Sequence, residues 1–231
     1  MSISIAIDGP SGAGKSTLAK SVSKELDYLY VDTGAIYRTI GYAALVNKRD
    51  PKDAAAVAAM LPDLEIGLCY GADGLQHMTL NGKDVTEQIR LPETSLYASA
   101  VSAHPAVRAH LLEMQRKLAR ENNVVMDGRD IGTAVLPDAT LKVYLTASSH
   151  VRAERRYKEL TERGESCSLE AIEQDIIERD YRDMHRELSP LKQAEDAILL
   201  DTSALNFEEV MREMEKLVEA AKKNPIAVGN F

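Results

Sequence analysis

Residues 3–24 read ISIAIDGPSGAGKSTLAKSVSK, and this stretch decides the fold. It begins with a short apolar run that ends at Ile7 and is typical of a β-strand. Residues 9–16 then match the phosphate-loop (P-loop) pattern G-x-x-x-x-G-K-[ST] at every fixed position. Leu18 and Val22 follow at the spacing of one helix face. Because a strand, a glycine-rich loop and a helix occur in this order, the stretch predicts a phosphate-binding site.

Each residue type of this loop suits an anionic ligand. Glycine has no Cβ, so the backbone can approach an anion closely. The N–H groups of the loop and of the first helical turn point at that anion, and the helix dipole adds a favourable field. Lys15 can reach the β- and γ-phosphates of a nucleotide, and the Ser16 hydroxyl is a natural Mg²⁺ ligand. We therefore expect a nucleoside triphosphate to bind here, and the alternative is an ordinary glycine-rich turn.

The composition limits the class of protein. With 231 residues, of which 45% are hydrophobic and 28% charged, the chain is typical of a soluble globular protein. No apolar run approaches the ~18 residues of a membrane span, and the N-terminus lacks the pattern of a secretory signal. We therefore expect a cytoplasmic protein in which Cys69 and Cys167 are reduced thiols. The net charge of −8 argues against a broad nucleic-acid-binding face and predicts that positive charge is concentrated locally.

Strand-like and helix-like segments alternate along most of the chain. Further apolar runs typical of strands occupy residues 28–31, 124–126, 141–145 and 197–200. Helical patterns occupy residues 33–45, 50–62, 148–163, 168–187 and 206–223, and two more helices follow residue 90, the second starting at Pro105. This alternation predicts an α/β fold with a largely parallel sheet between layers of helices.

Residues 63–90 have a different character. Apolar and polar residues alternate around Ile66 and around Met78, as in half-buried strands. Asn81-Gly82 is the strongest short hairpin signal in the chain. We expect this segment to form a small antiparallel sheet inserted into the α/β chain.

Asp127-Gly128-Arg129-Asp130 follows a buried strand, and ligands of parallel sheets bind beyond the carboxyl ends of the strands. Residues 9–16, 32–33 and 201–203 lie at the ends of other strands. An arginine at such a place can hold a phosphate through two hydrogen bonds, and the aspartates can accept from a base, a ribose or metal-bound water. The alternative is a turn with solvated charges, because Asp-Gly is a common turn pair.

Arg152, Arg155 and Arg156 lie at i, i+3 and i+4 on one face of an expected helix. Such a cluster can close over a polyphosphate and neutralise the charge of the transferred group. The alternative is a solvated helix whose arginines pair with Glu154 and Glu159.

Arg179, Arg182, Asp183 and Arg186 form a second stripe of charged residues at i, i+3, i+4 and i+7. The alternative here is an exposed helix stabilised by acid-before-base pairs such as Asp175–Arg179.

Taken together, these strings resemble one family, the bacterial cytidylate kinases, which are P-loop nucleoside monophosphate kinases. The matching segments are IAIDGPSGAGKST, VDTGAIYR, SAVSAHPAVR, VMDGRDIGT, the RxxRR face and IIERDYRD with Arg186. The likeness covers nearly the whole chain in the right order, and it includes the inserted sheet at 63–90.

The resemblance implies a three-layer P-loop kinase fold, with a mostly parallel five-stranded sheet flanked by helices and a helical lid. Residues 1–33, 104–147 and 188–231 would form the P-loop core. Residues 34–103 would form the nucleoside monophosphate-binding domain, and residues 148–187 the lid and the acceptor-contacting helices.

The resemblance also implies a role for each matched residue. The ATP phosphates would bind Gly9, Pro10, Ser11, Gly12, Ala13, Gly14, Lys15, Ser16 and Thr17, with Mg²⁺ at Ser16 and the adenine against Thr202 and Ser203. CMP or dCMP would bind Thr33, Tyr37, Arg38, Ser99, Arg108, Asp127, Gly128, Arg129, Asp130, Arg179, Asp183 and Arg186. The catalytic set would be Lys15, Arg129, Arg152, Arg156 and Arg179, whereas the individual roles of Arg155 and Arg182 stay open.

The implied activity is transfer of the ATP γ-phosphoryl group to CMP or dCMP by a cytoplasmic monomer that binds neither nucleic acid nor membrane. Two other activities remain open. A related P-loop kinase could use a different acceptor, and a P-loop switch could hydrolyse a nucleoside triphosphate to change its partners. The arginines expected at a second anionic site argue against the switch.

Overall fold

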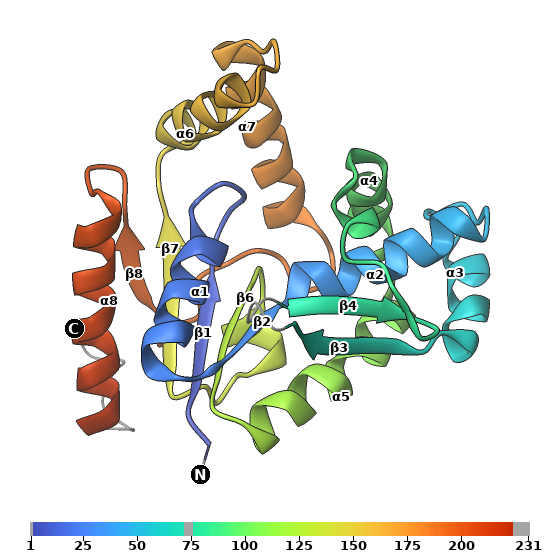
Figure 1. Cartoon of the computed structure of the whole chain (residues 1–231), viewed down its shortest axis with the longest axis horizontal. Helices are drawn as coiled ribbons and strands as arrows, with labels where there is room; N and C mark the ends of the chain where they lie inside the picture. Colours follow the sequence, from blue (N-terminus) through green and yellow to red (C-terminus); the bar gives the residue numbers. More distant parts are fainter. Residues whose placement is uncertain (1, 72–75, 224–231) are drawn as a thin grey trace. The chain divides into compact units, whose positions relative to one another are not determined.

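The computed structural model describes residues 2–71 and 76–223 (Figure 1). The elements up to residue 90 are β1 (Ser4–Asp8), α1 (Lys15–Leu26), β2 (Leu29–Asp32), α2 (Thr33–Val46), α3 (Ala54–Met60), η1 (Leu61–Asp63), β3 (Ile66–Tyr70), β4 (Gln76–Leu80), β5 (Lys83–Asp84) and η2 (Gln88–Arg90). They are followed by α4 (Pro92–Val101), α5 (Pro105–Glu121), β6 (Val124–Gly128), η3 (Ile131–Val135), β7 (Leu141–Thr146), α6 (Ser149–Glu162), α7 (Leu169–His185), β8 (Ile198–Asp201) and α8 (Phe207–Lys223).

Five strands form one sheet in the order β2-β6-β1-β7-β8. β1 pairs in parallel with β6 and with β7, so that Ile5 lies opposite both Val125 and Leu141. β7 also pairs in parallel with β8. The continuous apolar runs of these strands are explained by burial of both faces. The predicted mostly parallel, five-stranded sheet flanked by helices is confirmed.

The chain divides into two compact units, and the first contains the residues up to Tyr30 and those from Ala119 onward. Its core joins the sheet to two amphipathic helices, α1 and α8, which lie beside each other along the sheet (Figure 1). Leu18 and Val22 on α1 face inward, as do Met214 and Val218 on α8. Their spacing of four residues gives each helix one apolar stripe, which explains why both helices are held against the sheet.

The second unit spans Val31–Leu118 and contains a three-stranded antiparallel sheet in the order β3-β4-β5. Asn81 and Gly82 both have positive φ, of 50° and 75°, which matches the twist that a two-residue hairpin needs. The predicted hairpin is therefore confirmed. On α2, Gly41 allows a close approach of α4, because a Cβ at this position would lie 2.6 Å from the Ala98 nitrogen.

Two local features differ from the sequence-based expectation. The helix expected from residue 50 begins only at Ala54, because the Asp53 carboxylate accepts hydrogen bonds from the N–H groups of Ala55 and Ala56 and caps the helix there. Residues Ile131–Val135 form a short π-helix that no sequence pattern predicted.

The boundaries of the three functional parts stay a prediction. Their outer limits, residues 1 and 231, lie outside the described residues. Within residues 2–71 and 76–223, no helix is both long and apolar enough to cross a bilayer.

Candidate active site

The P-loop of the first unit follows β1 and ends at the N-terminus of α1. Gly9 must be glycine, because it has a φ of 150° and a Cβ there would lie 1.9 Å from the Leu145 carbonyl oxygen. The residue that precedes α1, Gly14, has no side chain with which to cap the first-turn N–H groups. These N–H groups and the loop amides therefore form the kind of surface that binds phosphate.

Lys15 is buried at the start of α1, and its Nζ donates to the Pro10 carbonyl oxygen at 2.6 Å. Burial, and after it the positive charge of Arg129, lower the pKa of Lys15 well below its ordinary value, whereas Asp127 and Asp8 act in the opposite direction. Arg179 lowers this pKa further. Because positive groups from separate elements act on one buried ammonium group, this part of the molecule suits an anionic ligand.

Ser16 and Asp127 lie together beside this loop. Ser16 Oγ donates to Asp127 Oδ2 at 2.7 Å, and the buried Tyr30 hydroxyl donates to Asp127 Oδ1 at 2.9 Å. A hydroxyl and a carboxylate are the hard oxygen ligands that Mg²⁺ prefers, and Mg²⁺ usually keeps water and substrate phosphates as its other ligands. The side chains thus fit a magnesium ion. Asp127, expected on the acceptor side, lies against the expected metal ligand.

Asp8 connects the P-loop strand to the π-helix that follows β6. Its Oδ1 accepts from the Ile131 N–H and its Oδ2 from the Gly132 N–H, both at 2.7 Å. Burial raises the pKa of Asp8 from its ordinary 3.8 to about 6, although the two N–H donors favour the charged form. No sequence pattern predicted a role for Asp8, which stands out in the sequence only as a charged residue at the end of an apolar strand.

We expect the stability advantage of wild-type Asp8 over Asp8→Asn to grow as the pH falls from 7.5 to 5. Since the folded-state pKa is raised to about 6, this contribution is fully present below the ordinary value of 3.8 and is lost as the pH rises through 6. One pKa unit corresponds to about 1.4 kcal/mol, and pH 5 lies one unit below the folded-state pKa, so the difference in free energy of unfolding should grow by about 1.4 kcal/mol. Urea unfolding of both proteins at the two pH values measures it, and a constant difference would contradict the assignment.

Charged residues after β6 contact Asp183 near the end of α7 and Arg186, the residue that follows this helix. Arg129 Nε donates to Asp183 Oδ2 at 2.8 Å, and Arg186 Nη2 lies 3.4 Å from Asp130 Oδ1. Asp127 and Asp130 are each only 4% exposed, so the alternative of a turn with solvated charges does not describe these aspartates. The fold thus brings together four of the residues expected to bind the acceptor.

The three arginines expected to form one cluster on α6 make different contacts. Arg152 is buried against the P-loop and α7. Arg155 donates to the carbonyl oxygen of Thr202 at 2.8 Å and to its Oγ1 at 3.2 Å. Arg156 pairs with Glu159 at 3.0 Å, as the alternative of a solvated helix expected. In this structure, therefore, only Arg152 reaches the P-loop through a described contact, and the expected catalytic role of Arg156 stays a prediction.

Thr202 and Ser203, which follow β8, contact the end of β7 and the residue that precedes α6. The Ser203 hydroxyl accepts from the Ser148 N–H at 2.9 Å, and the Thr202 hydroxyl donates to the Thr146 carbonyl oxygen at 3.0 Å. Thr202 is buried, and its hydroxyl makes hydrogen bonds within the protein, with Thr146 and Arg155. The expected adenine contact at Thr202 and Ser203 stays a prediction.

The second unit carries the other residues expected to bind the acceptor. Arg38 Nη2 donates to Asp32 Oδ2 at 2.9 Å, and Asp32 also caps α2 through the Ala35 N–H. The Arg108 guanidinium lies 5.5 Å from the centre of the Tyr37 ring, a cation–π geometry. Two remaining residues differ in burial: Thr33 at the start of α2 is buried and Ser99 on α4 is exposed.

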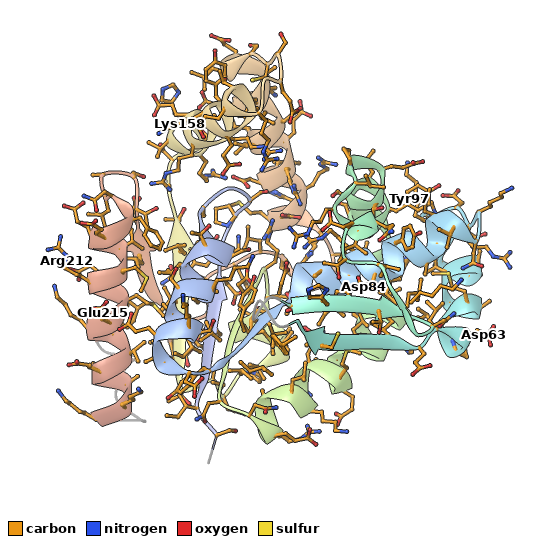
Figure 2. All side chains as sticks on the ribbon, in the orientation of Figure 1. Asp63, Asp84, Tyr97, Lys158, Arg212 and Glu215 are labelled. Atoms are coloured by element: carbon orange, nitrogen blue, oxygen red, sulfur yellow. The ribbon has the colours of Figure 1, made fainter. Side chains whose placement is uncertain are left out.

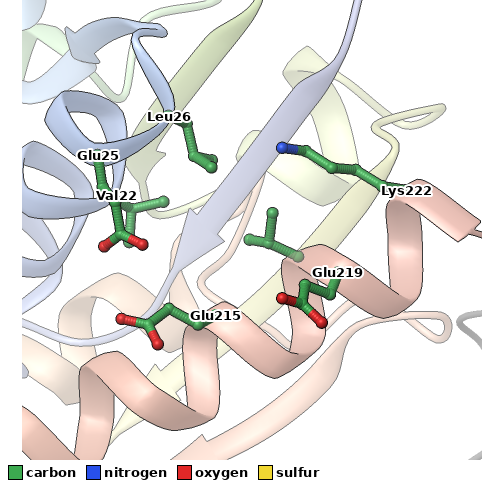
Figure 3. Close-up of a pocket in the computed structure, with 7 residues that line it drawn as sticks. Val22, Glu25, Leu26, Glu215, Glu219 and Lys222 are labelled. Atoms are coloured by element: carbon green, nitrogen blue, oxygen red, sulfur yellow. The ribbon is translucent and has the colours of Figure 1, made fainter.

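A cavity of about 190 Å³ lies between α1 and α8, away from the P-loop (Figure 3). It is lined by Val22, Glu25, Leu26, Glu215, Val218, Glu219 and Lys222. Three carboxylates against one ammonium group make this lining unsuitable for a polyphosphate. This cavity is therefore not a candidate nucleotide site, and the expectation of a nucleotide at the P-loop stays a prediction.

The chain is similar to known proteins over nearly its whole length. A family model described as cytidylate kinase matches residues 5–221. The cytidylate kinase of Caldicellulosiruptor bescii is 46% identical over 224 residues, which cover 97% of this chain and 99% of that protein. The cytidylate kinase of Bacillus cytotoxicus is 48% identical over 219 residues and covers 95% and 97%. That of Streptococcus pneumoniae is 46% identical over 221 residues and covers 96% and 98%.

Proposed function

The chain belongs to the cytidylate kinase family, and we propose that it transfers the γ-phosphoryl group of ATP to CMP or dCMP, giving ADP and CDP or dCDP. The observation that carries this proposal is the family match, which covers residues 5–221, from β1 to α8. The buried Lys15 beside Arg129 agrees with it, because two bound nucleotides bring many negative charges to one place.

The chain needs no strong general base for this transfer. The 5′-phosphate of CMP is largely ionised at neutral pH and already provides a nucleophilic oxygen. The protein therefore contributes position and charge: the loop amides and Lys15 hold the β- and γ-phosphates, and Arg129 and Arg179 stabilise the charge on the transferred group. Arg152 and Arg156 are proposed to add charge from the lid, the segment that would exclude water as a competing acceptor.

We propose Ser16 and Asp127 as the side chains that hold Mg²⁺. Mg²⁺, when bound, neutralises charge on the β- and γ-phosphates. Tyr30 fixes the Asp127 carboxylate by its hydrogen bond to Oδ1, so that Oδ2 stays directed at Ser16. Within the described residues, no group of three or more His, Cys, Asp or Glu side chains could hold a metal ion, which suits an ion held mainly by phosphates and water.

For the acceptor, we propose that Thr33, Tyr37, Arg38, Arg129 and Arg179 bind the phosphate of CMP. The cytosine would bind the remaining polar groups, Ser99, Arg108, Asp130 and Arg186, and the ribose would bind Asp183 with Arg179. Arg129 and Asp183 support one another in these roles, because their ion pair fixes both side chains. We also propose that the enzyme acts as a monomer in the cytoplasm. Residues 1–33, 104–147 and 188–231 would form the P-loop core, residues 34–103 the nucleoside monophosphate-binding domain, and residues 148–187 the lid and the acceptor-contacting helices.

The decisive experiment measures ADP release from MgATP with CMP, dCMP, UMP, AMP and GMP in parallel. We expect CMP and dCMP to be strongly preferred over the purine nucleotides, because a site built on hydrogen bonds discriminates by roughly 10⁴-fold or more. Equal turnover with CMP, AMP and GMP would contradict a site selective for cytosine, although the protein would still be a nucleoside monophosphate kinase. ADP release that no acceptor stimulates would instead favour a nucleotide-hydrolysing switch.

A further inference from the structure

Arg152 on α6 joins three separate segments of the first unit. Its Nε donates to the Ala147 carbonyl oxygen at 2.8 Å, and its Nη1 donates to the Ser11 carbonyl oxygen of the P-loop at 2.9 Å. Its Nη2 lies 2.7 Å from Asp180 Oδ2 on α7. The guanidinium group is planar and rigid, so these three contacts fix its position and direction together.

The stem of Arg152 lies close to Gly12 of the P-loop. A Cβ at Gly12 would lie 3.5 Å from Arg152 Cβ, which is ordinary van der Waals contact. The side chain of Arg152 is only 6% exposed, whereas that of Lys158 on the same helix, labelled in Figure 2, is 78% exposed. Arg152 therefore holds the P-loop backbone by a hydrogen bond at Ser11 and lies close to it at Gly12.

Asp180 is the partner that fixes Arg152 from the far side. It is only 9% exposed, and its Oδ1 has no hydrogen-bond partner among the described residues. Burial of a carboxylate is costly, and a residue that served only the helix would be exposed, as the neighbouring Glu178 and Arg182 are. We therefore attribute the burial of the Asp180 carboxylate to its ion pair with Arg152, which Asp180 makes through Oδ2.

We propose that Asp180 is a positioning residue for ATP: its charge fixes Arg152, and Arg152 holds residues 11 and 12 of the P-loop in the shape that binds the phosphates. Asp180 touches no nucleotide in this role, and it acts only through Arg152. The inference rests on the proposed function in one respect, namely that ATP is the donor bound by this loop.

Asp180→Asn tests the proposal, because it removes the charge and keeps the shape of the side chain. The amide oxygen can stay next to Arg152 although the charge is lost, so we expect a partial loss: about a tenfold rise in the dissociation constant of MgATP, or ~1.4 kcal/mol. KM for ATP should rise in parallel, while KM for CMP should stay within about twofold, since the ion pair lies on the donor side. Isothermal titration and initial rates measure these values.

A double mutant shows whether Asp180 acts through Arg152. If it does, Asp180→Asn should change ATP affinity by less than about twofold in an Arg152→Ala background, because coupled residues are not additive. Glu178→Gln is the matched control: it removes the same charge from an exposed position on α7 and should leave the affinity for ATP unchanged.

Three results would overturn the proposal: an unchanged or tighter affinity for ATP in Asp180→Asn, an equal rise of both KM values, or additive effects in the double mutant. Thermal unfolding checks that the variants fold. Should Asp180→Asn fail to fold, Arg152→Lys replaces it, because lysine keeps the charge but lacks the fork that makes three contacts, and the same selective loss is expected. ATP binding is measured without an acceptor, so failure of wild-type protein to phosphorylate CMP would refute the proposed function and leave this test standing.

Discussion

Lys15→Met should lower kcat by about a thousandfold, because removing a preorganised donor to the transferred phosphoryl group costs roughly 10²–10³ and Lys15 also supplies a full charge. Its Nζ, which donates to the Pro10 carbonyl oxygen here, is within reach of loop-bound phosphates. The variant should stay folded, because methionine fills a similar volume and the buried positive charge it removes already lies near Arg129 and Arg179. Turnover at saturating ATP and CMP, together with thermal unfolding, measures both effects.

The control for this substitution is Lys24→Met on the same helix. Lys24 is exposed, so this change removes a positive charge of α1 away from the loop and should leave kcat within about twofold. Wild-type turnover of Lys15→Met at saturating nucleotides would show that the P-loop does not hold the reacting phosphates.

Arg129→Ala should lower kcat by about a hundredfold or more, with a smaller rise in KM for CMP. Arg129 contributes charge at the end of β6, and it also fixes Asp183 through the bond at 2.8 Å. Both effects are lost in the alanine variant, whereas Arg129→Lys keeps the charge and loses the planar fork. We therefore expect Arg129→Lys to be intermediate, and initial rates over a range of CMP concentrations separate kcat from KM.

Arg212→Ala provides the matched control for this substitution, because Arg212 lies exposed on α8, away from the P-loop (Figure 2). Equal activity of Arg129→Ala and Arg212→Ala would contradict a role of Arg129 in phosphoryl transfer. A large fall in thermal stability of Arg129→Ala without a change in kcat would assign the residue to stability alone.

Local patterns predicted much of the fold, since each depends on residues that are close in sequence. The P-loop between β1 and α1 follows from fixed glycine and lysine positions, and the hairpin at Asn81-Gly82 follows from two residues that tolerate positive φ. The start of α3 was misplaced by four residues, because Asp50 and Asp53 are both suitable caps and sequence alone does not decide between them.

The sequence by itself therefore determined the α/β class, the phosphate loop and the set of charged residues that a nucleotide site needs. Only the tertiary structure decided which of these charges meet. Arg152, Arg155 and Arg156 look equivalent on a helical face, yet one is buried on the P-loop, one binds Thr202 and one pairs with Glu159. The contacts of Asp8, Tyr30 and Asp180 join residues far apart in the chain. The reason is physical: helical periodicity fixes the face of a residue, whereas its partner depends on which other element packs against that face.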